Sequence, residues 1–332
     1  MTDASEVWEL LEGFHVALVQ TDKVTIQNDG TVPDENAEDI RRRFRELALE
    51  MNGSLGLDSP LSQDARSTLG RRIQSVMLPS LWLTGTVERT YSKPHGYAGD
   101  FRMIQGLYDN IARGYGRLGP LIDRCYMDQP ACVAVQNRRG LLRREIEQTI
   151  RDRSPDRPVR VTSLASGPAQ EVFDVFEQQP ESSCLFATLI DLDDQALAFV
   201  RDKAVTFERI NQLVLHQANL LYLAAGRKHL EIPPQDLVYS IGLIDYFPDK
   251  YVVALMNYAH GLLRPGGRLI LGNFHPRNPS KALMEHVLEW ILIHRTEDDL
   301  NRLYEQSHFA RPATRIQFEE QGINLFAECI KS

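Results

Sequence analysis

The sequence predicts an α/β protein in which an all-helical N-terminal domain, residues 1–152, precedes a doubly wound sheet domain, residues 153–332. Apolar residues recur at three- and four-residue spacing through the first half, which is the helical period. Beyond residue 155, short apolar runs alternate with helical segments, as in a parallel sheet covered on both faces. The turn-rich stretch RSPDRP, residues 153–158, separates the two patterns and sets the predicted boundary.

Long helices are expected in the first half over residues 5–20, 36–52, 59–78 and 130–151. The apolar face of the second helix is expected to hold Ile40, Phe44, Leu47 and Leu49. The third helix is expected to stop before Pro79, because a proline within a helix removes one backbone hydrogen bond.

Seven strands are expected at residues 159–165, 184–192, 211–217, 235–242, 267–274, 315–320 and 324–330. They are rich in Val, Ile, Leu and Phe and are bounded by turn residues. Only residues 321–323 join the last two, which is too short for a parallel crossover. One terminal strand is therefore expected to be antiparallel.

The composition excludes several classes of protein. A net charge of −8 and a pI near 5.6 argue against a nucleic-acid surface, and the arginine-rich residues 41–46 are interpreted as a solvated helix face. The four cysteines lack ligand spacing, so neither a disulfide framework nor a metal site is expected, and a cytoplasmic location fits. The sequence shows no signal peptide and no membrane span. The oligomeric state stays open, a homodimer included.

The first strand-to-helix turn, SLASGPAQE, is the predicted cofactor site, because ligands bind beside such turns at the carboxyl ends of parallel strands. Gly167 lets the backbone approach a ligand closely, and Ser166 is small. A plain tight turn is the alternative. Asp191 ends the second strand, 24 residues after Gly167, where its carboxylate can accept both hydroxyls of a ribose. We include its neighbour Leu192 in the predicted site.

The next two strands end in polar residues suited to the same ligand. Asn219, after the third strand, offers an amide to the edge of a purine. Ser240, Asp245 and Tyr246 follow or end the fourth strand. They are expected to border the place where the reactive part of the cofactor meets the substrate.

The segments VTSLASGPAQE, LIDLDDQAL, HQANL, LVYSIGLIDYF and LLRPGGRLILGNF, in this order, resemble class I S-adenosylmethionine-dependent methyltransferases over about the last 180 residues. The resemblance implies a Rossmann-like sheet of seven strands with the last one antiparallel. It also implies S-adenosyl-L-methionine as cofactor, with its methionine at Gly167, its ribose at Asp191 and its adenine at Asn219.

The segments YSKPHGYAGDF and QPACVAVQNRRGLL, with SLASGPAQE, resemble the bacterial extracellular-factor 3-hydroxypalmitate methyl ester biosynthesis family. That family implies methyl transfer to a fatty-acid carboxylate, and similar enzymes have been associated with cyclising S-adenosylmethionine to azetidine-2-carboxylate. Methyl transfer to a carboxylate or hydroxyl of a small or acyl metabolite is our first hypothesis. A hydroxyl acceptor needs a general base, for which Asp245 and His275 are candidates. Cyclisation and a non-catalytic binding module are the alternatives.

The stretch YSKPHGYAGDF, residues 91–101, is too irregular for a helix or strand and too aromatic for a linker. We expect it to act as a lid, with Tyr91 and Tyr97 against the cofactor's sulfonium and Asp100 accepting from its ammonium. Ser163 stands where many members of this class carry an acid, so the ammonium needs another partner. Asn137 and Glu171 are further candidates; for the arginines beside Asn137, a solvated helix face is an alternative at least as strong as a role in the site. An inter-domain loop with packed aromatics is the alternative to a lid.

Overall fold

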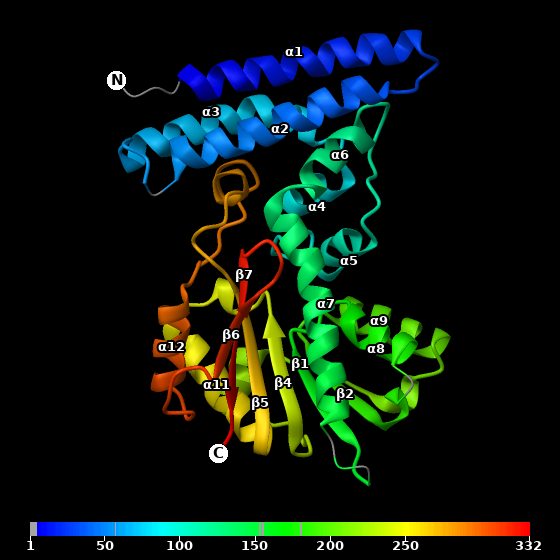
Figure 1. Ribbon diagram of the computed structural model, residues 1–332, viewed down its shortest axis with the longest axis vertical. Helices are drawn as coiled ribbons and strands as arrows, with labels where there is room; N and C mark the ends of the chain where they lie inside the picture. The colour runs from blue at the N-terminus through cyan, green and yellow to red at the C-terminus, as the bar shows by residue number, and fades with distance from the viewer. Residues whose placement is uncertain (1–4, 57, 153, 155, 180) are drawn as a thin grey trace. The chain divides into compact units, whose positions relative to one another are not determined.

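The computed structural model describes residues 5–56, 58–152, 154, 156–179 and 181–332 and divides the chain into two compact units (Figure 1). Unit 1 comprises Met1–Val133 and Arg277–Ile291, and unit 2 comprises Ala134–Pro276 and Leu292–Ser332.

Unit 1 is helical. Its long helices α1, α2 and α3 lie side by side in Figure 1 and are followed by three short helices. The bounds are α1 (Ser5–Gln27), α2 (Asp34–Leu55), α3 (Gln63–Leu81), α4 (Gly85–Ser92), α5 (Phe101–Asp109) and α6 (Gly119–Met127), with a π-helical turn η4 (Leu283–Val287). The rings of Phe14 and Phe44 meet edge to face, with centroids 5.5 Å apart, and link α1 to α2.

Two expectations for these helices are wrong. Leu49 is 58% exposed, and the buried face of α2 continues through Ala48 and Met51 instead. The helix α3 does not stop before Pro79 but runs on to Leu81. Pro79 lies in the last turn, where the missing N–H removes a single hydrogen bond and the helix ends two residues later.

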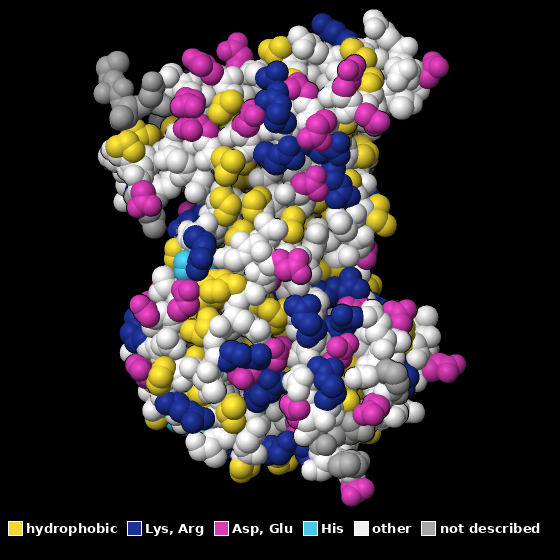
Figure 2. Space-filling view, viewed as in Figure 1, with side chains coloured by type: hydrophobic (Ala, Val, Ile, Leu, Met, Phe, Trp, Pro, Cys, Tyr) yellow, Lys and Arg dark blue, Asp and Glu magenta, His cyan; other side chains and the backbone are white. Residues whose placement is uncertain are grey.

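The arginine-rich stretch of α2 is a solvated helix face, as expected. Its arginines form ion pairs with acidic residues of the same helix: Arg41–Glu38, Arg42–Asp39, Arg42–Glu46, Arg43–Asp39 and Arg45–Glu38. Figure 2 shows basic and acidic side chains interspersed over this part of unit 1.

Unit 2 contains a seven-stranded sheet of order β3-β2-β1-β4-β5-β7-β6. The strands are β1 (Val159–Leu164), β2 (Leu185–Asp191), β3 (Leu213–Gln217), β4 (Gln235–Ile241), β5 (Leu263–Phe274), β6 (Arg315–Phe318) and β7 (Asn324–Ile330). β7 runs antiparallel to both β5 and β6, and the other pairings are parallel. The predicted Rossmann-like sheet with an antiparallel last strand is thus confirmed.

Helices cover both faces of the sheet. One core cluster joins the strands to α7 (Pro130–Arg151), α8 (Gln170–Gln178) and α9 (Asp194–Thr206). The other joins them to α10 (Leu220–Ala224), α11 (Asp249–Leu262) and α12 (Glu297–Gln306). Three 3-10 turns, η1 (Ser182–Cys184), η2 (Ile210–Gln212) and η3 (Ile244–Tyr246), complete the unit.

The division between the units differs from the predicted boundary at residues 152 and 153. Leu141, Leu142, Ile146 and Ile150 of α7 are buried in the core with β1 and α8, so α7 beyond Val133 is part of the sheet unit. The distant segment Arg277–Ile291 belongs to unit 1. A turn-rich stretch marks a break in secondary structure, whereas a compact unit is defined by packing, which the local sequence does not show.

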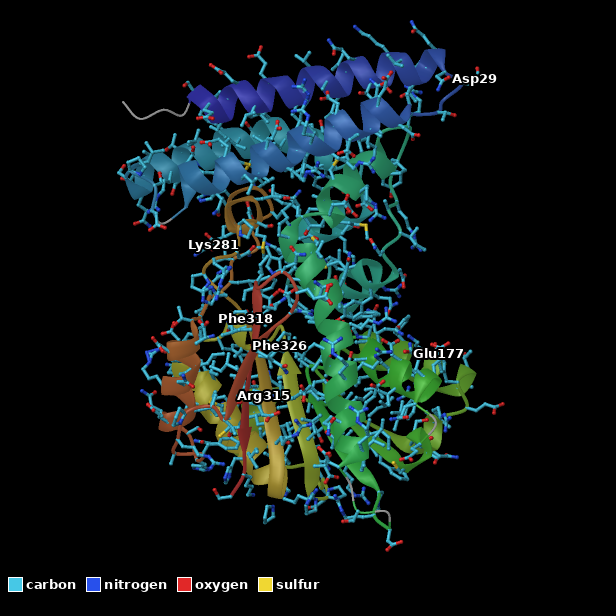
Figure 3. All side chains as sticks on the ribbon, viewed as in Figure 1. Asp29, Glu177, Lys281, Arg315, Phe318 and Phe326 are labelled. Atoms are coloured by element: carbon cyan, nitrogen blue, oxygen red, sulfur yellow. The ribbon has the colours of Figure 1, made fainter. Side chains whose placement is uncertain are left out.

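Buried ion pairs anchor α7 to the sheet. Glu145 of α7 accepts from Arg268 of β5 at 2.9 Å and from Arg315 of β6 at 2.7 Å, and Gln317 adds a bond of 2.8 Å. Figure 3 labels Arg315 on its strand. Burial alone would raise the pKa of Glu145, but the Gln317 amide and the two guanidinium groups hold it below its ordinary value.

We expect Glu145→Ala to lower the free energy of unfolding by about 1.5–3 kcal/mol, because it removes a buried carboxylate that accepts from both Arg268 and Arg315 and leaves them only Glu328 as a carboxylate partner. The matched control is Glu147→Ala on the same helix, whose contacts with Arg143 and Arg151 are long and span one helical turn. That control should cost a few tenths of a kcal/mol. Denaturant titration of both variants is the measurement, and equal losses would contradict a special role for Glu145.

Candidate functional site

The loop after β1 has an unusual backbone. Ala165, Gly167 and Ala169 all have positive φ, at 59°, 52° and 48°. The amides of Ala165 and Ser166 both donate to the Ile190 carbonyl, at 2.9 and 3.2 Å, which ties the loop to β2. Positive φ at an alanine costs roughly 1 kcal/mol, and such strain gathers where a protein must shape a ligand site.

Asp191 holds this loop from the tip of β2. Its carboxylate accepts from the Gly167 amide at 2.8 Å and from the Asp193 amide at 3.0 Å. Burial raises the pKa of Asp191, although the backbone amides of Asp193, Gly167 and Leu192 oppose the shift. A carboxylate has about four acceptor positions, so at least one remains for a hydroxyl of a ribose.

The space beside the loop is open. Apart from Gly167 and its two neighbours in the chain, no described residue has a heavy atom within 4 Å of the position that a Cβ would take at Gly167. Leu192 follows Asp191 with its side chain 62% exposed, and the hydroxyl of Ser166 is buried without a partner among the described residues. An apolar surface, an acceptor and a free backbone edge thus meet at the ends of β1 and β2.

Asn219 has a structural task of its own. Its Oδ1 caps α10 by accepting from the amides of Leu221 and Tyr222, at 2.9 and 3.3 Å. That leaves its Nδ2 group for any ligand. Gln217, the last residue of β3, donates to the Leu192 carbonyl at 3.3 Å.

The structure separates the predicted residues around the end of β4 into different environments. Ser240 is buried and its hydroxyl donates to the Leu164 carbonyl at 2.8 Å, so its side chain braces β4 against β1. Tyr246 is half-buried at the end of η3. Asp245 is fully buried in η3, and its Oδ1 accepts from the Phe274 amide at 2.7 Å.

Asp245 is the most perturbed carboxyl of this region. Its Oδ2 has no partner among the described residues. Burial raises the pKa of Asp245 to about 6, although the Phe274 amide and the charges of Arg138 and Arg295 oppose the shift. A carboxyl of this kind can exchange a proton near neutral pH.

Arg295 locks the turn that carries Asp245, and no sequence pattern singles it out. The guanidinium donates to the carbonyls of Ile244 and Phe247, at 2.8 and 2.6 Å, and to Asn273 at 3.0 Å. These partners come from two strand ends that are distant in sequence. No local spacing could have indicated such a network.

Asn137 and Glu171, the other candidates for the ammonium, both have protein partners. Asn137 donates to Glu319 at 3.0 Å, and Glu319 in turn accepts backbone amides of the turn between β6 and β7. Glu171 accepts from the Tyr239 hydroxyl at 2.7 Å, and burial raises its pKa. Asn137 thus joins α7 to the hairpin.

The structure decides against a solvated helix face, one of the two alternatives for the arginines next to Asn137. Arg138 is only 5% exposed, and Arg139 pairs with the buried Asp174, at 2.5 and 2.7 Å. The helical period offered a signal for Arg138, because Val135 and Leu142, three residues before and four after it, both face the core.

The remaining predicted residues belong to unit 1. Tyr91 is in the last turn of α4, with its ring edge-on to Trp82 at 6.0 Å, and Tyr97 is half-buried. Asp100 caps α5 and pairs with Arg89 at 2.8 Å. The irregular stretch is shorter than expected, since Tyr91 and Ser92 end one helix and Phe101 begins the next. Its approach to a cofactor stays a prediction.

Two searches of the described residues gave no candidates. No described helix has both the length and the apolarity needed to cross a membrane. Within the same residues, no three His, Cys, Asp or Glu side chains come together as metal ligands.

The buried Asp245 generates a pH-dependent prediction. Since its pKa in the folded protein, about 6, exceeds the ordinary 3.8, the unfolded chain releases this proton first as the pH rises. Asp245 therefore weakens the fold progressively up to about pH 6. Asp245→Asn keeps the acceptor for the Phe274 amide but does not titrate. The free energy of unfolding of this variant, relative to the parent protein, should therefore rise by about 1–2 kcal/mol as the pH increases from about 5 to about 7.5. Denaturant titrations of both proteins at the two pH values are the measurement. A difference in unfolding free energy that is the same at both pH values would contradict the prediction.

The chain was then compared with known proteins. A family model described as a putative methyltransferase matches residues 96–326. No curated protein matches the chain. A solved structure described as a possible exported protein from Bordetella parapertussis aligns with a TM-score of 0.57 and 18% identity, over 100% of this chain and 99% of that one, which shows a shared fold.

More distant likenesses include two methyltransferases. Magnesium protoporphyrin IX methyltransferase from Synechocystis, solved with S-adenosylhomocysteine, has a TM-score of 0.49 and 11% identity over 74% of this chain and 99% of that one. The N-methyltransferase NodS from Bradyrhizobium japonicum has a TM-score of 0.42 and 15% identity over 69% of this chain and 97% of that one. These two carry no inference by themselves. The family match covers well over half of the sequence, and the chain therefore belongs to the family of putative methyltransferases.

Proposed function

We propose that the protein is an S-adenosyl-L-methionine-dependent methyltransferase that acts on an oxygen of a small or acyl metabolite. The observation that supports this cofactor is the Asp191 carboxylate. It accepts a hydrogen bond from the Gly167 amide and keeps an acceptor position for a ribose beside an open loop. Membership of the family of putative methyltransferases supports a methyl group as the group that is transferred. Asp191, Gly167 and Leu192 would hold the nucleoside, with Asn219 offering its Nδ2 to the adenine.

Bound S-adenosylmethionine would supply an electrophilic methyl group, and the protein would align it with the acceptor oxygen and exclude water. A carboxylate acceptor needs no base, because it is already ionised. With a hydroxyl acceptor, Asp245 is the candidate base. At neutral pH a carboxyl with a pKa of about 6 is mostly ionised, and its Oδ2 has no partner among the described residues.

The lid remains part of this proposal. Tyr91 and Tyr97 would present aromatic faces to the sulfonium, which is worth about 0.5–2 kcal/mol. Asp100 keeps one buried carboxylate oxygen without a partner among the described residues, although its other oxygen caps α5. That free oxygen is what supports a role in binding the ammonium.

One observation favours cofactor cyclisation as a second candidate. The end of β1 carries the buried Ser163 instead of a carboxylate, while the nearby carboxyl of Asp245 has a pKa suited to accept a proton. In that reaction the amine attacks its own γ-carbon, the bond from this carbon to sulfur breaks, and methylthioadenosine leaves. The ammonium proton would go to Asp245 before the attack.

Product analysis separates the two reactions. Incubating the purified protein with S-adenosylmethionine, with and without a fatty acid such as 3-hydroxypalmitate, should give S-adenosylhomocysteine and a methyl ester only with the acceptor. Methylthioadenosine and a four-membered amino acid formed without acceptor would overturn methyl transfer in favour of cyclisation. Mass spectrometry distinguishes all four products.

Gly167 provides a binding test with a matched control. Gly167→Ala should cost roughly 1 kcal/mol of stability through its positive φ and should weaken S-adenosylhomocysteine binding at least about tenfold, because the methyl group points into the open space. Gly266→Ala has the same strain and the same open surroundings, but it lies near the start of β5, away from the site. Calorimetry that finds full affinity in the folded Gly167 variant would refute close backbone approach.

A further inference from the structure

Arg138 is a buried cation that has no counterion in contact among the described residues. Its side chain is 5% exposed, and no described residue accepts a hydrogen bond from the guanidinium or forms an ion pair with it. Other arginines of unit 2 differ, since the half-buried Arg268 contacts two carboxylates and the buried Arg295 contacts Asp249. A buried charge is costly unless something pairs with it, so the structure implies a partner that comes from outside the chain.

The guanidinium lies at the carboxyl end of β4. A Cβ placed on Gly242 would be 3.0 Å from its Nη1 and 3.5 Å from its Nη2. Gly242 has φ +76° and follows the last residue of the strand. Any larger residue at this position would push the guanidinium aside, so Gly242 makes room for it.

Two carboxyls face Arg138 without touching it. Its charge acts on Glu171, at the start of α8, and on Asp245, in η3. Neither forms an ion pair with it; Glu171 accepts instead from the Tyr239 hydroxyl, and Asp245 accepts from the Phe274 amide. The guanidinium therefore sits between the loops that follow β1 and β4, with its donors unused by described residues.

The strand order indicates which part of the proposed cofactor would reach Arg138. A ribose bound by Asp191 lies at β2, and β1 and then β4 follow on one side of it, whereas β3 lies on the other. Adjacent strands are about 4.8 Å apart, so a ligand that extends from β2 past β1 reaches β4 within roughly 10 Å. With the adenine toward Asn219 at β3, the amino-acid end of the cofactor must extend in this direction.

We propose that Arg138 binds the α-carboxylate of S-adenosylmethionine and of S-adenosylhomocysteine. This inference rests on the proposed function. A guanidinium can hold a carboxylate through two parallel hydrogen bonds, which suits a planar anion and compensates the buried charge. Ser166, whose buried hydroxyl also lacks a described partner, lies on the loop that such a ligand would cross. An acceptor substrate also has a carboxylate in one of the proposed reactions, and the test separates these two sources.

The experiment compares two ligands that differ only by the carboxylate: S-adenosylhomocysteine and its decarboxylated form, S-adenosyl-3-thiopropylamine. Calorimetry should show that Arg138→Met weakens S-adenosylhomocysteine binding by about 10- to 100-fold, as expected for a charged hydrogen bond, and leaves the decarboxylated ligand within about twofold. Arg144→Met is the matched control, because it removes an exposed positive charge from the same helix. It should change neither affinity.

Two results would overturn the inference, and a third would refute the proposed function on which it rests. Equal losses for both ligands would mean that Arg138 only supports the fold of the site. Unchanged binding of both would mean that the cofactor carboxylate binds elsewhere and that Arg138 serves another anion, such as that of the acceptor. Failure of the parent protein to bind S-adenosylhomocysteine at all would instead refute the proposed function.

A second variant, Arg138→Lys, tests the inference if Arg138→Met fails to fold. If Arg138→Met does not fold, Arg138→Lys keeps the charge but not the paired donors. It should lose part of the preference for S-adenosylhomocysteine over the decarboxylated ligand while keeping the melting temperature of the parent protein. A full preference in this variant would contradict paired hydrogen bonding by Arg138.

Discussion

The hydrogen bond from the Gly167 amide to the Asp191 carboxylate is the constraint around which the site is built. It joins the loop after β1 to the tip of β2, and it requires a backbone at positive φ that places Gly167 beside open space. A buried carboxylate without such donors would favour its neutral form, so the two amides that Asp191 accepts also support its charge. The interaction that shapes the loop is therefore also the one that keeps the acceptor charged for a ligand.

Buried polar groups at this end of the sheet divide into two kinds. Ser240, Glu171 and Arg295 have protein partners and hold strand ends and turns together. Arg138 and one oxygen of Asp245 are equally buried but have no hydrogen-bond partner among the described residues. Native proteins rarely leave such groups without a reason, because each costs free energy that other interactions must offset. Their concentration beside β1 and β4 is the observation that supports the proposed ligand site at this end of the sheet.

The helix α7, which carries Arg138, also makes interactions that offset the cost of these unpaired buried groups. The helix α7 places Arg138 near the carboxyl end of the sheet and, two turns later, places Glu145 among Arg268 and Arg315. Its apolar residues lie in the core between these points and beyond them. A satisfied ionic cluster and a packed apolar face hold the helix firmly, so that an unpaired guanidinium can be positioned precisely.

The sequence alone determined the seven strands and the antiparallel last strand, because these depend on local periodicity and on order along the chain, and it placed Gly167 and Asp191 at the ends of the first two strands. It could not determine which side chains would be satisfied by distant partners. Arg138 had the appearance of a solvated arginine until the fold placed it beside Gly242, more than one hundred residues away. Leu49 and the boundary of the sheet unit were misjudged for the same reason. Burial and pairing are properties of the folded neighbourhood, and only the tertiary structure brings that neighbourhood together.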